Sequence, residues 1–366
     1  MLVVHEMDAR SRIEAKPKLR APRGPTFAEG SVARVRVSGP KHKEKIKFDA
    51  SRLAFVTGGA GEPAVFVHGF GSDKSAWQRV CHGLKDVFTF YAIDLPGSGD
   101  SPAPRHFHYT LEHLADVLTD FIIMKDLKKL TLVGASLGGT VVLLALLRNR
   151  SELQHRVRAL CLIDAVAYSQ QFPFLLDVLR TPILGPVALN LPFSVPLPLP
   201  VPGAPAILPL LADLLSPQYA RRRVREALIE TACLINAKHL ARYVSRLKTI
   251  HFPTLVIWGR DDDVVHLGLG KRLARELPNS RLIIIGHCGH APHQECPAKV
   301  IASLKQFIQG ISDNISSKTA EIGSAVGPSG EHDLYGPGWR VGSPLQQLVH
   351  DHAKAHGDHE QNHARG

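Results

Sequence analysis

Short apolar runs rich in β-branched residues recur along the middle of the chain, most of them bounded by Gly, Pro, Asp or Asn. Runs of this length and composition predict β-strands. The predicted strands cover residues 53–57, 64–67, 89–93, 130–134, 159–163, 254–258 and 282–285. Most of these runs are apolar on both faces, whereas a strand with one solvated face alternates apolar and polar residues. The pattern therefore predicts a sheet that is covered by other elements on both sides.

Longer stretches between those runs have apolar residues at helical spacing. They cover residues 110–125, 137–148, 267–276 and 298–309. Strands that alternate with helices favour parallel pairing, because each helix returns the chain to the edge where the next strand starts. We therefore predict the α/β class, with a doubly wound and mostly parallel sheet.

One interval breaks this alternation. About ninety residues separate the strand that ends at Ile163 from the strand that begins at Thr254, far more than a helical crossover needs. Residues 181–212 carry no charge and contain nine prolines, which would interrupt a membrane-spanning helix repeatedly. Residues 221–248 are basic and helical in pattern. We predict that residues 166–249 form an inserted cap with apolar loops and cationic helices.

The two ends of the chain lack this periodicity. Residues 1–50 mix Pro, Arg, Lys and Gly, and residues 312–366 are rich in Ser, Gly, His and Asp. Both segments are predicted to be flexible, because they hold too few apolar residues to form a core. The folded core is then expected over residues 51–165 and 250–311.

Composition and charge narrow the classes of function. The 366 residues carry a formal net charge of +11, and 44% of them are hydrophobic. A basic surface can attract nucleic acid, but no base-reading or RNA-binding motif accompanies it, so we expect no nucleic-acid partner. Weak association with a membrane surface through the basic helices stays open. The five cysteines show no paired spacing, and the first residues lack the apolar stretch of an export signal, so a cytoplasmic location is expected.

The pentad Gly134-Ala135-Ser136-Leu137-Gly138 follows one predicted strand directly and begins a predicted helix. This context indicates a sharp strand-to-helix turn, at which flanking glycines avoid collisions and the central serine is exposed above the sheet. A serine hydroxyl becomes a nucleophile when a base removes its proton, and the base needs a carboxylate to orient it. Two other predicted strand ends offer such groups, in Gly259-Arg260-Asp261-Asp262-Asp263 and Gly286-His287-Cys288-Gly289-His290.

Serine, aspartate and histidine thus follow three strands in that order, at the edge where open α/β sheets place their active sites. Over residues 51–311 the chain resembles the α/β-hydrolase superfamily. The motifs that carry the resemblance are His68-Gly69-Phe70-Gly71, Asp94-Leu95-Pro96-Gly97-Ser98-Gly99, the Ser136 pentad, Trp258-Gly259-Arg260-Asp261-Asp262 and Gly289-His290. The resemblance implies Ser136 as nucleophile, His290 as general base and Asp262 as the acid of a catalytic triad.

Other carboxylates stay open as the acid. Asp261 and Asp263 are neighbours of Asp262, and Asp164 is a more distant alternative, because some members of the superfamily place the acid after the strand that ends at Ile163. The resemblance also implies that the backbone N–H groups of Phe70 and Leu137 stabilise the developing oxyanion.

The expected function is hydrolysis of a carboxylic ester with a hydrophobic acyl group, through an acyl-enzyme. The same triad also serves C–C bond hydrolases, perhydrolases and acyltransferases, and a noncatalytic lipid-binding or scaffold protein is the alternative from another class. No Gly-x-Gly-x-x-Gly loop opens a helix after the first strands, so no nucleotide cofactor is expected. No metal is expected either, because His287, Cys288, His290 and His293 have no second ligand pair at zinc-finger spacing.

Overall fold

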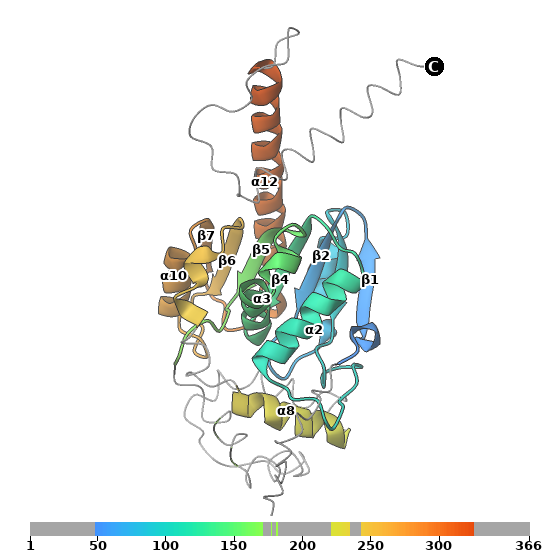
Figure 1. Cartoon of the computed structure of the whole chain (residues 1–366). Coiled ribbons are helices and arrows are strands. Elements are labelled where there is room, and N and C mark those ends of the chain that lie inside the picture. Colours follow the sequence, from blue (N-terminus) through green and yellow to red (C-terminus); the bar gives the residue numbers. More distant parts are fainter. Residues whose placement is uncertain (1–47, 171–176, 178–180, 182–220, 235–242, 326–366) are drawn as a thin grey trace, which may run out of the picture. The chain divides into compact units, whose positions relative to one another are not determined.

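The computed structural model describes residues 48–170, 177, 181, 221–234 and 243–325. Within them, seven strands form one sheet in the order β1-β3-β2-β4-β5-β6-β7 (Figure 1). The strands are β1 (Phe55–Gly59), β2 (Glu62–Val67), β3 (Phe88–Ile93), β4 (Leu130–Ala135), β5 (Val157–Ile163), β6 (Thr254–Gly259) and β7 (Ser280–Ile285). Neighbouring strands are parallel except β1 and β3, which are antiparallel. The predicted α/β class with a mostly parallel sheet is confirmed.

Helices cover both faces of this sheet. The α-helices are α1 (Gln78–Gly83), α2 (Leu111–Met124), α3 (Leu137–Arg148), α4 (Arg150–Leu153), α8 (Arg222–Leu234), α10 (Leu267–Glu276), α11 (Pro292–Glu295) and α12 (Pro297–Ala325). The 3-10 helices are η1 (Ala50–Arg52), η2 (Lys74–Trp77) and η4 (Leu247–Thr249). Helices α2 and α3 pack together over one face, and α12 lies on the other (Figure 1). Helix α1 packs with α12.

Side chains that alternate along one strand enter two separate cores. In β2, Val65 and Val67 belong to the apolar cluster that includes α2 and α3, whereas Ala64 and Phe66 belong to the cluster that includes α1 and α12. All four residues are fully buried. Burying one large apolar side chain stabilises the fold by about 1.5–3 kcal/mol. Side chains on both faces of β2 contribute such burial. This two-sided burial is the reason that the strand has no polar face.

The structure differs from the sequence-based prediction mainly at the ends of elements. Helix α12 continues past residue 312 to Ala325, into the segment predicted to be flexible. The apolar residues of that segment are too sparse to mark a helical face in the sequence. The sequence analysis also missed α1 and α11, because helices of one or two turns are too short to show a period.

The described part of the predicted cap is mainly α8. Its buried residues Val224, Ala227, Leu228 and Ala232 belong to the same apolar cluster as α2 and α3. Most of the uncharged, proline-rich stretch lies outside the described residues, as do both segments 1–47 and 326–366. Among the helices that the structure describes, none combines the length and apolar character needed to cross a bilayer.

Candidate active site

Three side chains from distant parts of the sequence meet beyond the carboxyl ends of the parallel strands. Ser136 follows β4, Asp262 follows β6, and His290 follows β7. The His290 imidazole lies between the other two, with Nε2 2.9 Å from Ser136 Oγ and Nδ1 2.9 Å from Asp262 Oδ2. The structure therefore brings together the three residues that the sequence analysis selected for a triad.

Ser136 occupies a strained turn between β4 and α3. Its backbone has φ 50° and ψ −117°, a conformation that non-glycine residues rarely adopt. The Ser136 N–H donates a hydrogen bond to Ile163 O at 2.9 Å, which ties the turn to β5. A Cβ at Gly134 would lie 2.6 Å from Gly138 O, and a Cβ at Gly138 would overlap Val67 O. Close approaches of the backbone thus require glycine on both sides of the serine.

The Asp262 carboxylate is held by hydrogen bonds to both of its oxygens. Oδ1 accepts from the backbone N–H groups of Val264 and Val265, both at 2.8 Å, and Oδ2 contacts His290. The Asp262 side chain is 0% exposed, whereas that of His290 is 20% exposed. Asp261 and Asp263 are exposed. Only the middle residue of the three consecutive aspartates therefore reaches the imidazole.

This arrangement determines which nitrogen of His290 carries the proton. A carboxylate can only accept, so Nδ1 must donate its proton to Asp262 Oδ2. Nε2 then has a free lone pair that can accept the hydroxyl proton of Ser136. The geometry is suited to general-base activation of a serine hydroxyl at the exposed end of the sheet.

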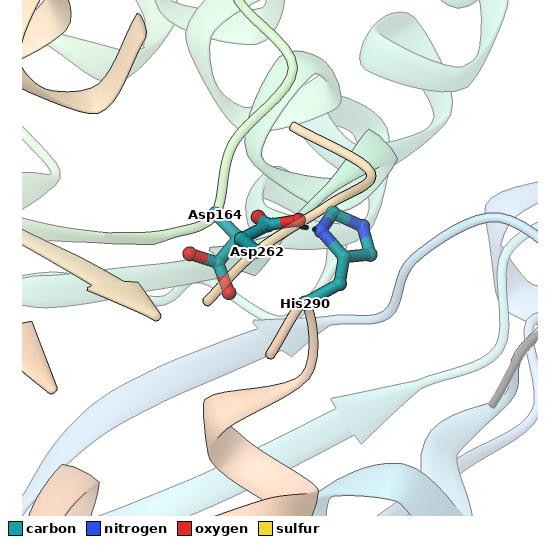
Figure 2. A group of neighbouring side chains, drawn as sticks. All are labelled: Asp164, Asp262 and His290. Carbon is teal, nitrogen blue, oxygen red and sulfur yellow. Dashed lines mark hydrogen bonds and ion pairs between the residues drawn. The ribbon is translucent and has the colours of Figure 1, made fainter. Parts of the chain in front are cut away.

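Asp164 supplies a second carboxyl group beside the first. It follows β5, its Oδ1 accepts from Gly259 N–H at 2.9 Å, and its Oδ2 has no hydrogen-bond partner among the described residues. Figure 2 shows Asp164 and Asp262 next to His290, with the hydrogen bond drawn to Asp262. Burial raises the pKa of the Asp164 carboxyl well above its usual range, and the neighbouring Asp262 charge raises it further. The surroundings of Asp164 therefore favour its protonated form.

We expect Asp164→Asn to raise the Tm at pH 8. In the wild type, the folded state keeps a proton on Asp164 that the unfolded chain has lost above its pKa of about 3.8, so stability falls as the pH rises above that value. Asparagine is neutral in both states and removes this dependence, and each kcal/mol gained corresponds to roughly 2–4 °C in Tm. Thermal unfolding of both proteins at pH 4, 6 and 8 tests this. A difference that does not grow with pH would mean that Asp164 is ionised in the folded protein.

The loop after β2 carries the other predicted oxyanion donor, Phe70. His68 holds this loop: its Nε2 accepts from Leu95 N–H at 3.0 Å, so Nδ1 carries the proton and donates to Gly69 O at 2.8 Å. Burial lowers the pKa of His68, which keeps the ring neutral as these two bonds require. Both ring nitrogens of His68 are engaged in hydrogen bonds that shape the loop.

Phe70 and Leu137, the two predicted oxyanion donors, line one small cavity of about 20 Å³ together with Gly69. Leu228 and Thr231 of α8 line the same cavity, so the described part of the predicted cap contributes to it. Phe172, Phe174 and Phe193, the cap aromatics of the sequence, lie outside the described residues.

Asp164, Asp262 and His290 also form a group of metal-ligand type, with one potential ligand atom from each residue within 4.8 Å of the others. Hydrogen bonds explain why Asp262 and His290 lie close together, because one imidazole nitrogen faces Asp262 and the other faces Ser136. We therefore assign no ion to this group.

Comparison with known proteins connects this site to hydrolases. A family described as "Alpha/beta hydrolase family" matches residues 64–303. The 2-hydroxy-6-oxo-2,4-heptadienoate hydrolase of Pseudomonas putida is 30% identical over 63% of this chain and 83% of its own length. The pimeloyl-[acyl-carrier protein] methyl ester esterase of Neisseria meningitidis is 27% identical over 69% of this chain and 78% of its own. The structure of a thermophilic esterase from Thermogutta terrifontis has a similar fold, with a TM-score of 0.53 and 24% identity over 71% of this chain and 93% of that one.

Proposed function

The chain belongs to the alpha/beta hydrolase family, and on this premise we propose that it is a serine hydrolase that cleaves carboxylic esters of hydrophobic acyl groups. The observation that carries the proposal is the chain of hydrogen bonds from Ser136 Oγ through His290 to the buried Asp262 carboxylate. Binding alone does not require a histidine that is hydrogen-bonded both to a buried carboxylate and to a serine in a strained turn.

In the proposed reaction, Ser136 Oγ attacks the ester carbonyl while His290 Nε2 accepts the hydroxyl proton. Asp262 keeps Nδ1 protonated and stabilises the imidazolium that forms. His290 then returns the proton to the leaving alcohol, and an acyl group remains on Ser136. A water molecule activated by His290 releases the acid and regenerates the enzyme.

The tetrahedral intermediate needs hydrogen-bond donors for its oxyanion. We assign this role to the backbone N–H groups of Phe70 and Leu137, supported by their position on one cavity beside Ser136. Removing one such donor in other enzymes costs about 10²–10³ in kcat. The Leu137 N–H lies at the N-terminus of α3, where the helix dipole also favours negative charge.

We expect the enzyme to prefer longer apolar acyl chains over acetate. The uncharged stretch of the predicted cap would be costly to leave in water, and it would offer apolar surface to an acyl chain. Each buried methylene contributes roughly 0.8 kcal/mol, so four more methylenes can add about 3 kcal/mol of binding. Values of kcat/KM for p-nitrophenyl acetate, butyrate, octanoate and laurate test this. A steady fall from acetate onward would contradict an acyl-binding cap.

C–C bond hydrolysis is the second candidate, supported by the activity that the name of the Pseudomonas putida relative states. This reaction would use the same three residues to cleave a C–C bond instead of an ester bond. The experiment that separates the two functions therefore compares substrates. Cleavage of 2-hydroxy-6-oxo-2,4-heptadienoate together with inertness toward every ester would overturn the ester proposal and leave the roles of the three residues in place.

A further inference from the structure

Glu295 accepts hydrogen bonds from the backbone on both sides of His290. Its Oε2 accepts from Gly289 N–H at 2.6 Å, and its Oε1 accepts from Ala291 N–H at 3.0 Å. Each carboxylate oxygen therefore accepts a hydrogen bond from one of the two residues that flank His290. A carboxylate is well suited to this task, because both of its oxygens accept hydrogen bonds and both bonds are charge-assisted.

Other hydrogen bonds hold the first part of the β7–α11 loop: Asp261 N–H donates to Cys288 O at 3.0 Å, and Lys299 Nζ donates to Gly286 O at 3.2 Å. The residues directly beside His290 have the Glu295 carboxylate as the acceptor for their N–H groups. Residues 286–291 belong to no helix or strand, and His287 has a left-handed backbone with φ 55°. Helix α11 has four residues, and its N-cap residue Ala291 has no side chain that could cap it. The return bond from Glu295 N–H to Ala291 O, at 2.8 Å, closes a ring between the loop and the end of α11.

We propose that Glu295 is a positioning residue of the catalytic machinery, which holds the backbone at His290 so that the imidazole spans Ser136 and Asp262. This role rests on the proposed function of Ser136 and His290. Glu295 is exposed and does not line the cavity that Phe70 and Leu137 share, so it acts through His290 and not through the substrate. It therefore affects proton transfer during turnover and leaves substrate binding unchanged.

The test compares Glu295→Gln and Glu295→Ala with wild type, and uses Glu152→Gln as the matched control. Glu152 is an exposed glutamate on α4, and its side chain accepts a hydrogen bond from the neighbouring Ser151 hydroxyl. The glutamine amide can accept from one N–H but presents its own N–H groups to the other, and alanine loses both bonds. Because misplacement of a catalytic group by 1 Å can cost about 10²-fold, we expect kcat to fall about 10-fold in Glu295→Gln and about 100-fold in Glu295→Ala.

Three readouts separate positioning from general stability. We expect KM to stay within about two-fold of wild type, the rate of Ser136 labelling by a fluorophosphonate to fall in parallel with kcat, and Glu152→Gln to match wild type. Wild-type kcat in a folded Glu295→Gln protein, or a raised KM with unchanged kcat, would overturn the proposal. If neither Glu295 variant folds, Glu295 is a folding determinant and the positioning role is likewise rejected. A wild-type protein that the fluorophosphonate does not label would instead overturn the proposed function.

Discussion

Replacing Ser136 with alanine should abolish hydrolysis, with a loss of about 10⁶ in kcat, the scale seen when a triad nucleophile is removed. The loss is this large because no other group takes over the attack: His290 Nε2 faces only the Ser136 hydroxyl in the described structure. The hydroxyl has little part in the fold, since the turn is held through the Ser136 N–H and C=O groups. We therefore expect the Tm of Ser136→Ala to stay near that of the wild type.

The measurement compares kcat of both proteins on the best p-nitrophenyl ester, with circular dichroism as the control for folding. Contaminating esterase from the expression host limits the smallest kcat that can be measured. The variant should therefore be purified from a host strain that does not hydrolyse the assay ester. Substantial turnover by a well-folded Ser136→Ala protein would exclude the serine mechanism.

Asp262→Asn should lower kcat by about 10⁴, because the change reverses the protonation of His290. The Val264 and Val265 N–H groups require an acceptor at the Oδ1 position, so the asparagine oxygen must stay there. The amide nitrogen then faces Nδ1, which can only accept from it. The imidazole proton moves to Nε2, and that nitrogen can no longer take the proton of Ser136.

Matched controls for this variant lie next to it. Asp261→Asn and Asp263→Asn alter exposed carboxylates and should retain most of the activity, measured on the same ester. Asp164→Asn changes a carboxyl that is bonded to Gly259 N–H and not to His290, and it should also remain active. A severe loss in Asp164→Asn with an active Asp262→Asn would assign the acid role to Asp164 instead.

The sequence is most informative about the candidate site where the proposed residues follow the ends of strands. Buried strands are recognisable as apolar runs, and in a parallel sheet their carboxyl ends share one edge, so the strand pattern places Ser136 and the segment from His287 to His290 at that edge. The choice of His290 within this segment needed the family resemblance. The choice among three consecutive aspartates needed the family resemblance, because one residue of difference turns a side chain away from the imidazole. The structure places only Asp262 against it.

Features that depend on burial or on short-range geometry could not be predicted. The raised pKa of Asp164 follows from its burial beside another carboxylate, which no local pattern in the sequence reveals. The Glu295 bonds depend on the short helix α11, which has no period to detect. The antiparallel pairing of β1 could not be predicted either, because the composition of a strand does not fix its direction.

The most direct test of the triad is covalent labelling of the wild-type protein with a fluorophosphonate, followed by intact mass and peptide mapping. An activated serine attacks phosphorus and expels fluoride, whereas an inert serine does not react. We predict one phosphonyl adduct per chain, located on Ser136, with no adduct in Ser136→Ala and a greatly slowed reaction in Asp262→Asn. A folded wild-type protein that stays unlabelled, or that carries the adduct on another residue, would contradict the assignment of Ser136 as the nucleophile.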